Sequence, residues 1–282
     1  MGKATVAEFV QRKPQGGRLT ILTAYDYPTA KLVDEAGVDA VLVGDSLGMV
    51  VLGYDSTARV TMDEMIHHAK AARRGVSRAL LIGDMPFLSF RGSIEEAVKN
   101  AARFIQDAGC DAVKVEWKQG IEDIAKAIID AGIPVMGHVG LTPQTATGEG
   151  GFGMRGKDAA SAARIIAQAL ALQAVGCFSI VVECVPDLVA AEITRRLSVP
   201  VIGIGSGPFC DGQVLVTHDL IGLFDRFTPK FVKRYADAGA VIRQAAASFV
   251  SEVKAGVFPG KDHTVTMRPE EVAKLREDLG PA

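Results

Sequence analysis

The sequence predicts a single (βα)8 barrel, and three observations support this fold class. Eight short apolar segments alternate with helical segments along 282 residues, a length that suits one large barrel. Four apolar segments end in a carboxylate at the same position: Asp45, Asp84, Glu116 and Glu183. Helix-to-strand joints repeat one phrase, in EAGVDAVLVGD, DAGCDAVKVE and DAGIPVMGH, whose glycine suits a left-handed helix cap. No linker composition divides the chain, so we expect one domain over residues 1–282.

The apolar segments define eight expected strands. Each reads as a buried parallel strand, with few polar residues inside it. The expected strands cover residues 19–24, 40–43, 80–83, 113–116, 134–137, 179–182, 200–204 and 214–217. The first strand lacks the G-x-G-x-x-G turn of a dinucleotide site, which favours a barrel over an open doubly wound sheet.

Helix start signals define the segments between the strands. Thr61 with Glu64, and Ser93 with Glu96, have capping-box spacing, and Pro28 suits a first helical turn. The expected helices cover residues 6–12, 28–36, 62–74, 93–108, 121–131, 158–175, 190–197 and 230–254. Residues 1–18 form an N-terminal helix and lead-in, residues 140–157 a glycine-rich loop, and residues 257–282 a C-terminal tail.

Composition excludes several classes of partner. A formal net charge of −2 gives no electrostatic case for nucleic acid or an anionic membrane. The apolar runs are shorter than the roughly 20 residues that span a bilayer, and the N-terminus lacks the apolar core of a signal peptide. We therefore expect a cytoplasmic protein that acts on small molecules. The four cysteines lack metal-ligand spacing and are expected as buried side chains or free thiols: Cys110, Cys177, Cys184 and Cys210.

Polar residues follow the strands where a barrel has its active site. The candidates are Asp26, Asp45, Ser46, Asp84, Lys114, Glu116, His138 and Glu183. One such acid alone would be read as a helix cap, but four in the same strand position indicate a shared metal site. Oxygen ligands without a Cys or His pair favour magnesium, which takes one or two protein carboxylates. We therefore expect Asp45 and Asp84 as direct ligands and Glu116 as a ligand through water.

The remaining candidates suggest how a substrate would be held and activated. Lys114 lies two residues before Glu116, so both should face one side of the strand, where Lys114 could bind a substrate carboxylate. Burial would raise the pKa of Glu183 and suit it as a general base beside a carbonyl, although a helix cap is the alternative. His138 is read equally well as a structural imidazole or as a ligand contact. The other histidines are expected on solvated faces: His67, His68, His218 and His263.

These segments resemble one family, the ketopantoate hydroxymethyltransferases. The resemblance runs over residues 19–238, through LTAYDYPTA, VLVGDSLGMVVLGYDSTARVTMDEM, GDMPF, VKVE, GHVGLTPQ, VVECVP, GIGSGPFCDGQVLVTHDLIG and FTPKFVKRYAD. It implies a barrel of the phosphoenolpyruvate mutase/isocitrate lyase superfamily, assembled as a homodecamer. It also implies Mg2+ and transfer of a hydroxymethyl group from 5,10-methylenetetrahydrofolate to 3-methyl-2-oxobutanoate, giving 2-dehydropantoate for pantothenate synthesis.

The resemblance also implies a role for each site residue. Asp45 and Asp84 are similar to the family's magnesium ligands, and Glu116 to its outer-sphere partner. Ser46 and Lys114 resemble the groups that hold the oxo-acid carboxylate. Glu183 resembles the base that removes the C3 proton, and His138 lines the pocket.

The chain departs from the family pattern in two loops. Trp117-Lys118 replaces two glycines, and GGFGMRG at residues 150–156 lacks a lysine. A side chain as bulky as Trp117 could narrow the pocket, so a diverged paralogue that binds oxo acids with altered preference or weak turnover is an alternative. A carbon–carbon lyase of the same superfamily is a second alternative, but its K-[KR]-C-G-H type loop is not found in the sequence.

Overall fold

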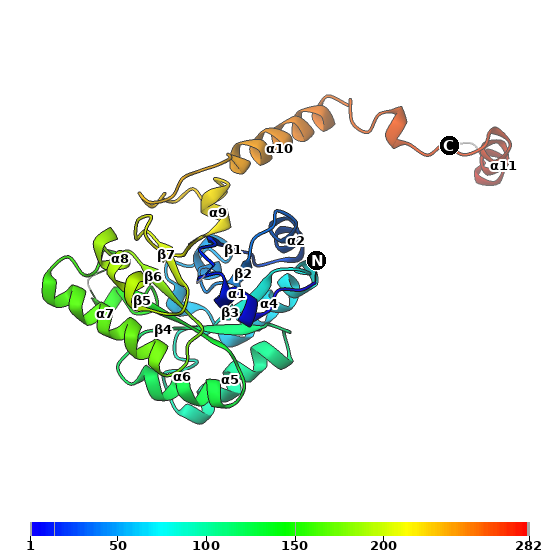
Figure 1. Ribbon diagram of the computed structural model, residues 1–282. Helices are drawn as coiled ribbons and strands as arrows, with labels where there is room; N and C mark the ends of the chain where they lie inside the picture. Colours follow the sequence, from blue (N-terminus) through cyan, green and yellow to red (C-terminus); the bar gives the residue numbers. More distant parts are fainter. Residues whose placement is uncertain (1, 14, 150, 281–282) are drawn as a thin grey trace. The chain divides into compact units, whose positions relative to one another are not determined.

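Eight parallel strands close into a barrel in chain order, as β8 returns to pair with β1 (Figure 1). The structure is a computed structural model that describes residues 2–13, 15–149 and 151–280. Its strands are β1 (Leu19–Thr23), β2 (Ala40–Val43), β3 (Leu80–Asp84), β4 (Ala112–Glu116), β5 (Val135–Gly140), β6 (Ser179–Glu183), β7 (Val201–Ile204) and β8 (Gly212–Leu215). The predicted fold class is therefore confirmed.

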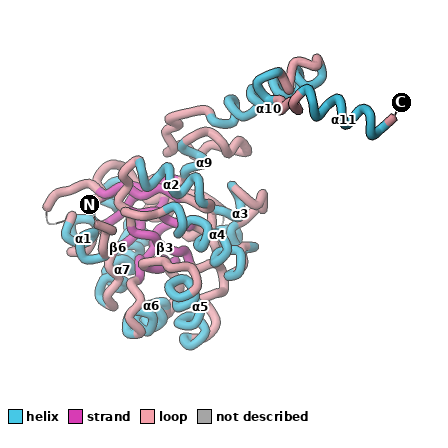
Figure 2. The backbone as a smooth tube through the Cα atoms, turned by 90° about the vertical axis from the view of Figure 1, so that its right-hand side faces the viewer, coloured by secondary structure: helices cyan, strands magenta, loops and turns pink. Residues whose placement is uncertain are grey.

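Helices surround this barrel, as Figure 2 shows. They are α1 (Val6–Gln11), α2 (Tyr27–Glu35), α3 (Leu47–Val50), α4 (Met62–Gly75), α5 (Ile94–Gln106), α6 (Ile121–Asp130), α7 (Ala159–Ala174), α8 (Asp187–Arg196) and α9 (Thr217–Leu220). Short 3-10 turns lie at η1 (Thr57–Arg59) and η2 (Ala146–Glu149). Thr61 and Glu64 cap α4 reciprocally, as their spacing predicts, and Ser93 accepts the backbone N–H of Glu96 at the start of α5.

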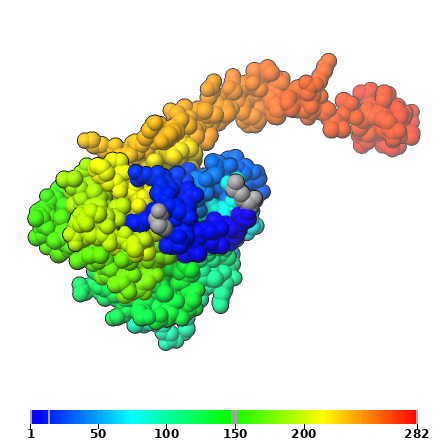
Figure 3. Space-filling model, viewed as in Figure 1, coloured from blue at the N-terminus to red at the C-terminus, as the bar shows by residue number. Residues whose placement is uncertain are grey.

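Side chains inside the barrel follow the two-residue period of a strand. The inward residues at the beginnings of the strands form one apolar cluster, which includes Leu19, Leu80 and Ala112. Helix α1 belongs to this cluster through Phe9, whose ring centroid lies 5.9 Å from that of Phe178. The N-terminal segment, blue in Figure 3, therefore covers the end of the barrel opposite the expected active site.

In the barrel, strand β8 and helix α8 begin at residues other than those predicted. Strand β8 begins at Gly212 instead of residue 214, because the backbones approach closely there. A Cβ atom at Gly212 would lie 2.5 Å from the Leu19 carbonyl oxygen. Helix α8 begins at Asp187, directly after Pro186, instead of at residue 190.

The chain divides into two compact units, Met1–Tyr235, which contains the barrel, and Ala236–Ala282. The second unit contains α10 (Ala238–Lys254), η3 (Lys261–His263) and α11 (Pro269–Leu279). Helix α10 starts later than predicted because Asp237 caps it, accepting the N–H of Ala240 at 2.9 Å. Helix α11 was not expected within the tail of residues 257–282, although Pro269 suits its first turn. The single domain over 1–282 stays a prediction.

No helix among the described residues has the length and hydropathy of a bilayer-spanning segment. Three of the cysteines are buried in the barrel unit, and Cys184 is half-buried after β6. All four are free thiols, as expected.

Candidate active site

The register of the barrel brings the candidate side chains together at the carboxyl ends of β3 to β6. Asp84 is the Cα partner of Lys114, and Glu116 is the partner of His138. Each of these four residues follows an inward apolar residue of its own strand by two or four positions. Because side chains two positions apart face the same side of a strand, each of the four projects into the barrel above the apolar cluster. Glu183 occupies the corresponding end of β6. The last inward residues of four neighbouring strands thus form one polar layer.

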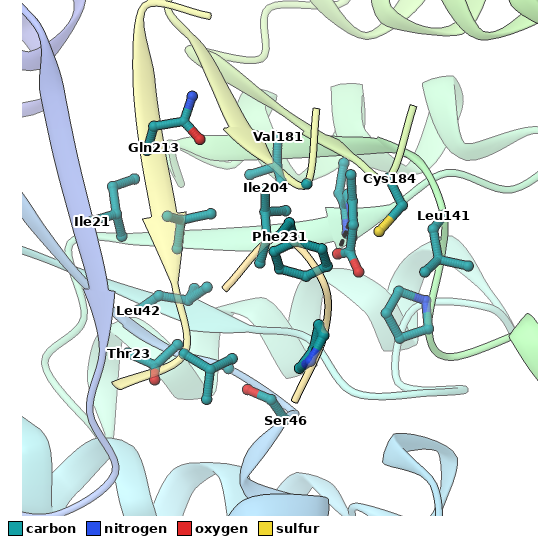
Figure 4. A pocket seen from close by; sticks show the side chains of 18 of the residues that line it. Ile21, Thr23, Leu42, Ser46, Leu141, Val181, Cys184, Ile204, Gln213 and Phe231 are labelled. Atoms are coloured by element: carbon teal, nitrogen blue, oxygen red, sulfur yellow. Dashed lines mark ion pairs between the residues drawn. The ribbon is translucent and has the colours of Figure 1, made fainter. Parts of the chain in front are cut away.

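This polar layer lines a cavity of about 1480 Å3. Asp45 and Ser46 reach the cavity from the turn after β2. In Figure 4, Leu42 and Ser46 lie on one side of the cavity and Leu141 on another, with Phe231 between them. Because most of the remaining lining is apolar, charges in the cavity are poorly solvated.

Asp45, Asp84 and Lys114 are in direct contact. The backbone N–H of Asp45 donates to Oδ2 of Asp84 at 3.1 Å, and Nζ of Lys114 lies 2.8 Å from Oδ1 of Asp84. Burial, followed by the negative charge of Asp84, raises the pKa of Asp45 to about 7. Burial lowers the pKa of Lys114, but the carboxylates around it outweigh burial and raise that pKa above its ordinary value. Lys114 therefore stays an ammonium inside the barrel.

His138 lies between Lys114 and Glu183. Burial, followed by the positive charge of Lys114, holds the pKa of His138 well below its ordinary value, so the imidazole is neutral. Nδ1 of His138 lies 3.3 Å from Nζ of Lys114 and must accept from it, since an ammonium has no acceptor. The ring hydrogen is therefore on Nε2, which lies 3.2 Å from Oε2 of Glu183 without forming a hydrogen bond to it.

Burial raises the pKa of two further carboxyl groups in this layer. Burial raises the pKa of Glu183 to about 7 and that of Glu116 well above its ordinary value. Glu116 accepts the backbone N–H of Gln144 at 3.2 Å, and Arg91 lies 3.9 Å from its Oε2. A carboxyl group with a pKa near neutrality can take a proton from carbon and release it again.

A family model described as ketopantoate hydroxymethyltransferase matches residues 3–261. The chain belongs to this family. A 3-methyl-2-oxobutanoate hydroxymethyltransferase from Acetivibrio thermocellus is 53% identical over 98% of this chain and 99% of its own. One of the same name from Heliobacterium modesticaldum is 54% identical over 95% of this chain and 97% of its own. The prediction of an enzyme of the ketopantoate hydroxymethyltransferase family is confirmed.

The fold of this ketopantoate hydroxymethyltransferase family member also matches solved structures. A 2,3-dimethylmalate lyase, described as a PEP mutase/isocitrate lyase superfamily member, is 14% identical with a TM-score of 0.56. The match covers 98% of this chain and 100% of that chain. The likeness agrees with the predicted (βα)8 barrel fold.

Gln144 and Tyr25 are site residues that sequence reasoning missed. Nε2 of Gln144 donates to Oδ2 of Asp45 at 3.0 Å and to the Met85 carbonyl at 2.8 Å. The Tyr25 hydroxyl lies 2.8 Å from Oγ of Ser46, and its ring is fully buried. Both residues lie in segments that resemble the family, GHVGLTPQ and LTAYDYPTA. Their position in these segments is the sequence signal that could have identified them as site residues.

Some candidates have a different environment from the one expected. Asp26 caps α2, accepting the Thr29 N–H at 2.8 Å, and does not line the cavity. His218 was expected on a solvated face but is only 8% exposed. Its ring packs against that of Tyr25, with 5.4 Å between the two ring centroids. His68 is half-buried, with Nδ1 2.7 Å from the Tyr25 carbonyl oxygen. Trp117 does not line the large cavity, so it does not narrow it.

The donor set of this family member suits magnesium. Asp45, Asp84 and Glu116 offer oxygen only, and Oε1 of Glu116 is buried without a hydrogen-bond partner. Burial, together with the neighbouring carboxylates, raises the pKa values of Asp45 and Glu116, and a divalent cation would favour their ionised forms. Among the described residues, no group of three or more acidic, His or Cys side chains is placed to hold a metal.

Proposed function

We propose that the protein transfers a hydroxymethyl group from 5,10-methylenetetrahydrofolate to 3-methyl-2-oxobutanoate and produces 2-dehydropantoate. The observation that carries the proposal is a half-buried carboxyl group, Glu183, beside the neutral His138 in a cavity that also holds the Asp45–Asp84 pair. The names of the relatives, 53% and 54% identical over nearly the whole chain, support this reaction.

Separate groups of the site would bind the carboxylate of the oxo acid and activate its 2-oxo group. The Ser46 hydroxyl, oriented by Tyr25, and the Lys114 ammonium would bind the substrate carboxylate. Mg2+ held by Asp45 and Asp84, with Glu116 acting through water, would polarise the 2-oxo group and stabilise negative charge on its oxygen.

Glu183 would then remove the C3 proton, since its pKa lies near neutrality. The carbon electron pair would form a bond to the methylene carbon of the donor and displace one of the two nitrogens bonded to that carbon. One water would displace the second nitrogen and supply the hydroxyl oxygen. The two nitrogens would take up the proton from C3 and one proton from that water, so that tetrahydrofolate and 2-dehydropantoate leave. The Nε2–H of His138 would stabilise the Glu183 carboxylate between turnovers.

The direct test incubates purified protein with Mg2+, methylenetetrahydrofolate and 3-methyl-2-oxobutanoate and follows 2-dehydropantoate by mass spectrometry. We expect product that depends on all three components. Binding of the oxo acid without product would reject the transferase and support the oxo-acid-binding paralogue.

We also propose that the chain works in the cytoplasm as a homo-oligomer, a decamer as the family resemblance implies. Apolar side chains exposed along α10 support association, including Val241, Ile242 and Phe249. Light scattering coupled to gel filtration tests this, and a monomer at micromolar concentration would contradict it.

A further inference from the structure

We propose that Asp219, Thr57 and the ring of Phe231 form a subsite of the large cavity for the pterin ring of the folate donor. This pterin subsite rests on the proposed function, because its ligand is the second substrate of that reaction. The cavity has the space for it, since about 1480 Å3 exceeds the roughly 300–1,000 Å3 of a typical small-molecule site. An oxo acid as small as 3-methyl-2-oxobutanoate leaves most of this volume to a second ligand.

The order of the strands separates the pterin subsite from the proton-transfer groups. Thr57 lies in η1, after β2, and Glu183 ends β6, which is four strands away in a closed barrel of eight. Asp219 lies on α9, directly after β8. Both Thr57 and Asp219 line the large cavity. A ligand bound by them would therefore leave Glu183 free to act on the oxo acid.

Thr57 presents a buried hydroxyl that has no partner. The residue is 3% exposed, and its Oγ1 makes no hydrogen bond to any residue that the structure describes. Turn η1 fixes its backbone, because Ser56 Oγ accepts the Ala58 N–H at 3.1 Å and the Thr57 carbonyl accepts the Val60 N–H at 3.1 Å. An unsatisfied buried hydroxyl costs free energy, and this one can donate to a ligand acceptor such as the 4-oxo oxygen of a pterin.

Asp219 presents a carboxylate to the same cavity. It is half-buried and makes no side-chain hydrogen bond within the described part of the chain. Burial raises the pKa of Asp219 to about 6 although the charge of Arg234 lowers it, so the group is mostly ionised at pH 7. The Arg234 guanidinium itself donates to the Phe224 carbonyl at 3.4 Å and to Thr228 Oγ1 at 2.5 Å. An ionised carboxylate can accept two adjacent N–H groups, which a pterin offers as its 2-amino group and N3–H.

The element that carries Asp219 borders the place proposed for the oxo-acid carboxylate. The ring of His218, the preceding residue, packs against Tyr25 with 5.4 Å between centroids. The Tyr25 hydroxyl in turn lies 2.8 Å from Oγ of Ser46. A pterin held by Asp219 would therefore lie next to an oxo acid at Ser46, which the transfer of the methylene carbon to C3 requires.

Phe231 supplies a flat apolar surface in the same cavity. It is 39% exposed, so part of its ring is open to a ligand. Gly205 fixes the ring by close contact, because a Cβ atom there would lie 2.7 Å from Cδ1 of Phe231. Figure 4 shows the ring between Ser46 and Leu141. Flat heterocycles stack on aromatic rings, so the pterin subsite combines hydrogen-bonding groups with a stacking surface.

Binding of tetrahydrofolate, the product that does not react further, tests the pterin subsite by isothermal titration in the presence of Mg2+. Asp219→Asn should weaken binding about 10–100-fold, because it removes a charged acceptor. Thr57→Val should weaken it about 3–10-fold, whereas Thr57→Ser keeps the hydroxyl and restores binding. Asp55→Asn is the matched control, since Asp55 lines the same cavity but is exposed and lies 3.5 Å from Arg226.

Two measurements separate a ligand contact from a structural role. Thr57→Val should be at least as stable as wild type in urea, because its hydroxyl has no partner to lose. A tetrahydrofolate analogue with a methyl group in place of the 2-amino group should bind wild type about tenfold more weakly than tetrahydrofolate does. Asp219→Asn should bind both ligands equally. An Asp219→Asn protein that binds tetrahydrofolate as wild type does, or that discriminates between the two ligands as wild type does, would overturn the pterin subsite.

Formation of 2-dehydropantoate by wild type tests the proposed function separately. Product formation together with equal tetrahydrofolate affinity of wild type and Asp219→Asn would overturn the pterin subsite and leave the reaction standing. Absence of product, together with the weaker binding expected of Asp219→Asn, would refute the reaction and leave the pterin subsite standing.

Discussion

Replacing Gln144 by methionine tests how the active site is assembled. Gln144→Met keeps the side-chain volume but removes the hydrogen bonds to Oδ2 of Asp45 and to the Met85 carbonyl. A hydrogen bond to a charged group contributes about 1.5–3 kcal/mol, so Asp45 would lose most of what orients its carboxylate. Removing a partner that orients a metal ligand typically lowers metal affinity by about 10–100-fold. We therefore expect Mg2+ affinity to fall within that range.

Isothermal titration of Mg2+ into wild type and Gln144→Met measures this effect. Gln213→Leu is the matched control, because Gln213 lines the same cavity but donates to the Gly207 carbonyl at 3.0 Å. Without the Gln144 bond, which lowers the pKa of Asp45, that pKa should rise further, so the loss of affinity should shrink at high pH. A Gln144→Met affinity within about twofold of wild type would refute the orienting role assigned to Gln144.

Four further predictions concern three carboxylates, those of Glu183, Asp84 and Asp34. Glu183→Gln should slow exchange of the C3 proton of 3-methyl-2-oxobutanoate into deuterated water by at least about 100-fold, while binding of the oxo acid persists. Undiminished exchange would show that Glu183 is not the base. Because burial raises the pKa of Glu183 to about 7, wild-type exchange should rise with pH up to about 7 and level off above it. Asp84→Asn should abolish Mg2+ binding measured by titration, whereas Asp26→Asn, at the cap of α2, should not; equal affinities contradict the ligand assignment. Asp34→Asn should lower the free energy of unfolding in urea by about 2–4 kcal/mol, since Asp34 accepts the N–H of Ala79 at 2.7 Å and that of Ser77 at 3.0 Å. Burial raises the pKa of Asp34, but these hydrogen bonds outweigh burial and lower that pKa. The stability contributed by the Asp34 carboxylate is therefore present above its unfolded pKa and is lost as the pH falls through its folded pKa. An Asp34→Asn protein as stable as wild type at pH 7 would disprove this contribution.

The polar ends of the strands could be predicted from the sequence because the signal is local. At Asp84 and Glu183 an apolar run stops at a carboxylate, and the strand period then fixes which side the carboxylate faces. Barrel closure follows from the alternation of eight apolar strands with helices in chain order. The inward position of Lys114 follows from the same period, counted from Glu116.

The contacts between distant segments could not be predicted in this way. Gln144 is hydrogen-bonded to Asp45, which is 99 residues away in the sequence. The residues around either of them give no indication that the two side chains are in contact. His218 sits on a short helix with polar neighbours, so its burial against Tyr25 depends on tertiary packing. Helix α11 follows a segment without strong apolar periodicity, and its start depends on local signals at Pro269.

The pairing of Asp84 with Lys114 and of Glu116 with His138 has a consequence for how such an enzyme can change. Because hydrogen-bonded strand partners fix these groups, a one-residue slip of any strand would turn its reactive side chain out of the barrel. Insertions between strands leave the partners unaltered. The register of these paired groups is therefore independent of the loops, so that changes in the loops beyond Gln144 and Trp117 would alter the entrance to the site and leave the polar layer in place.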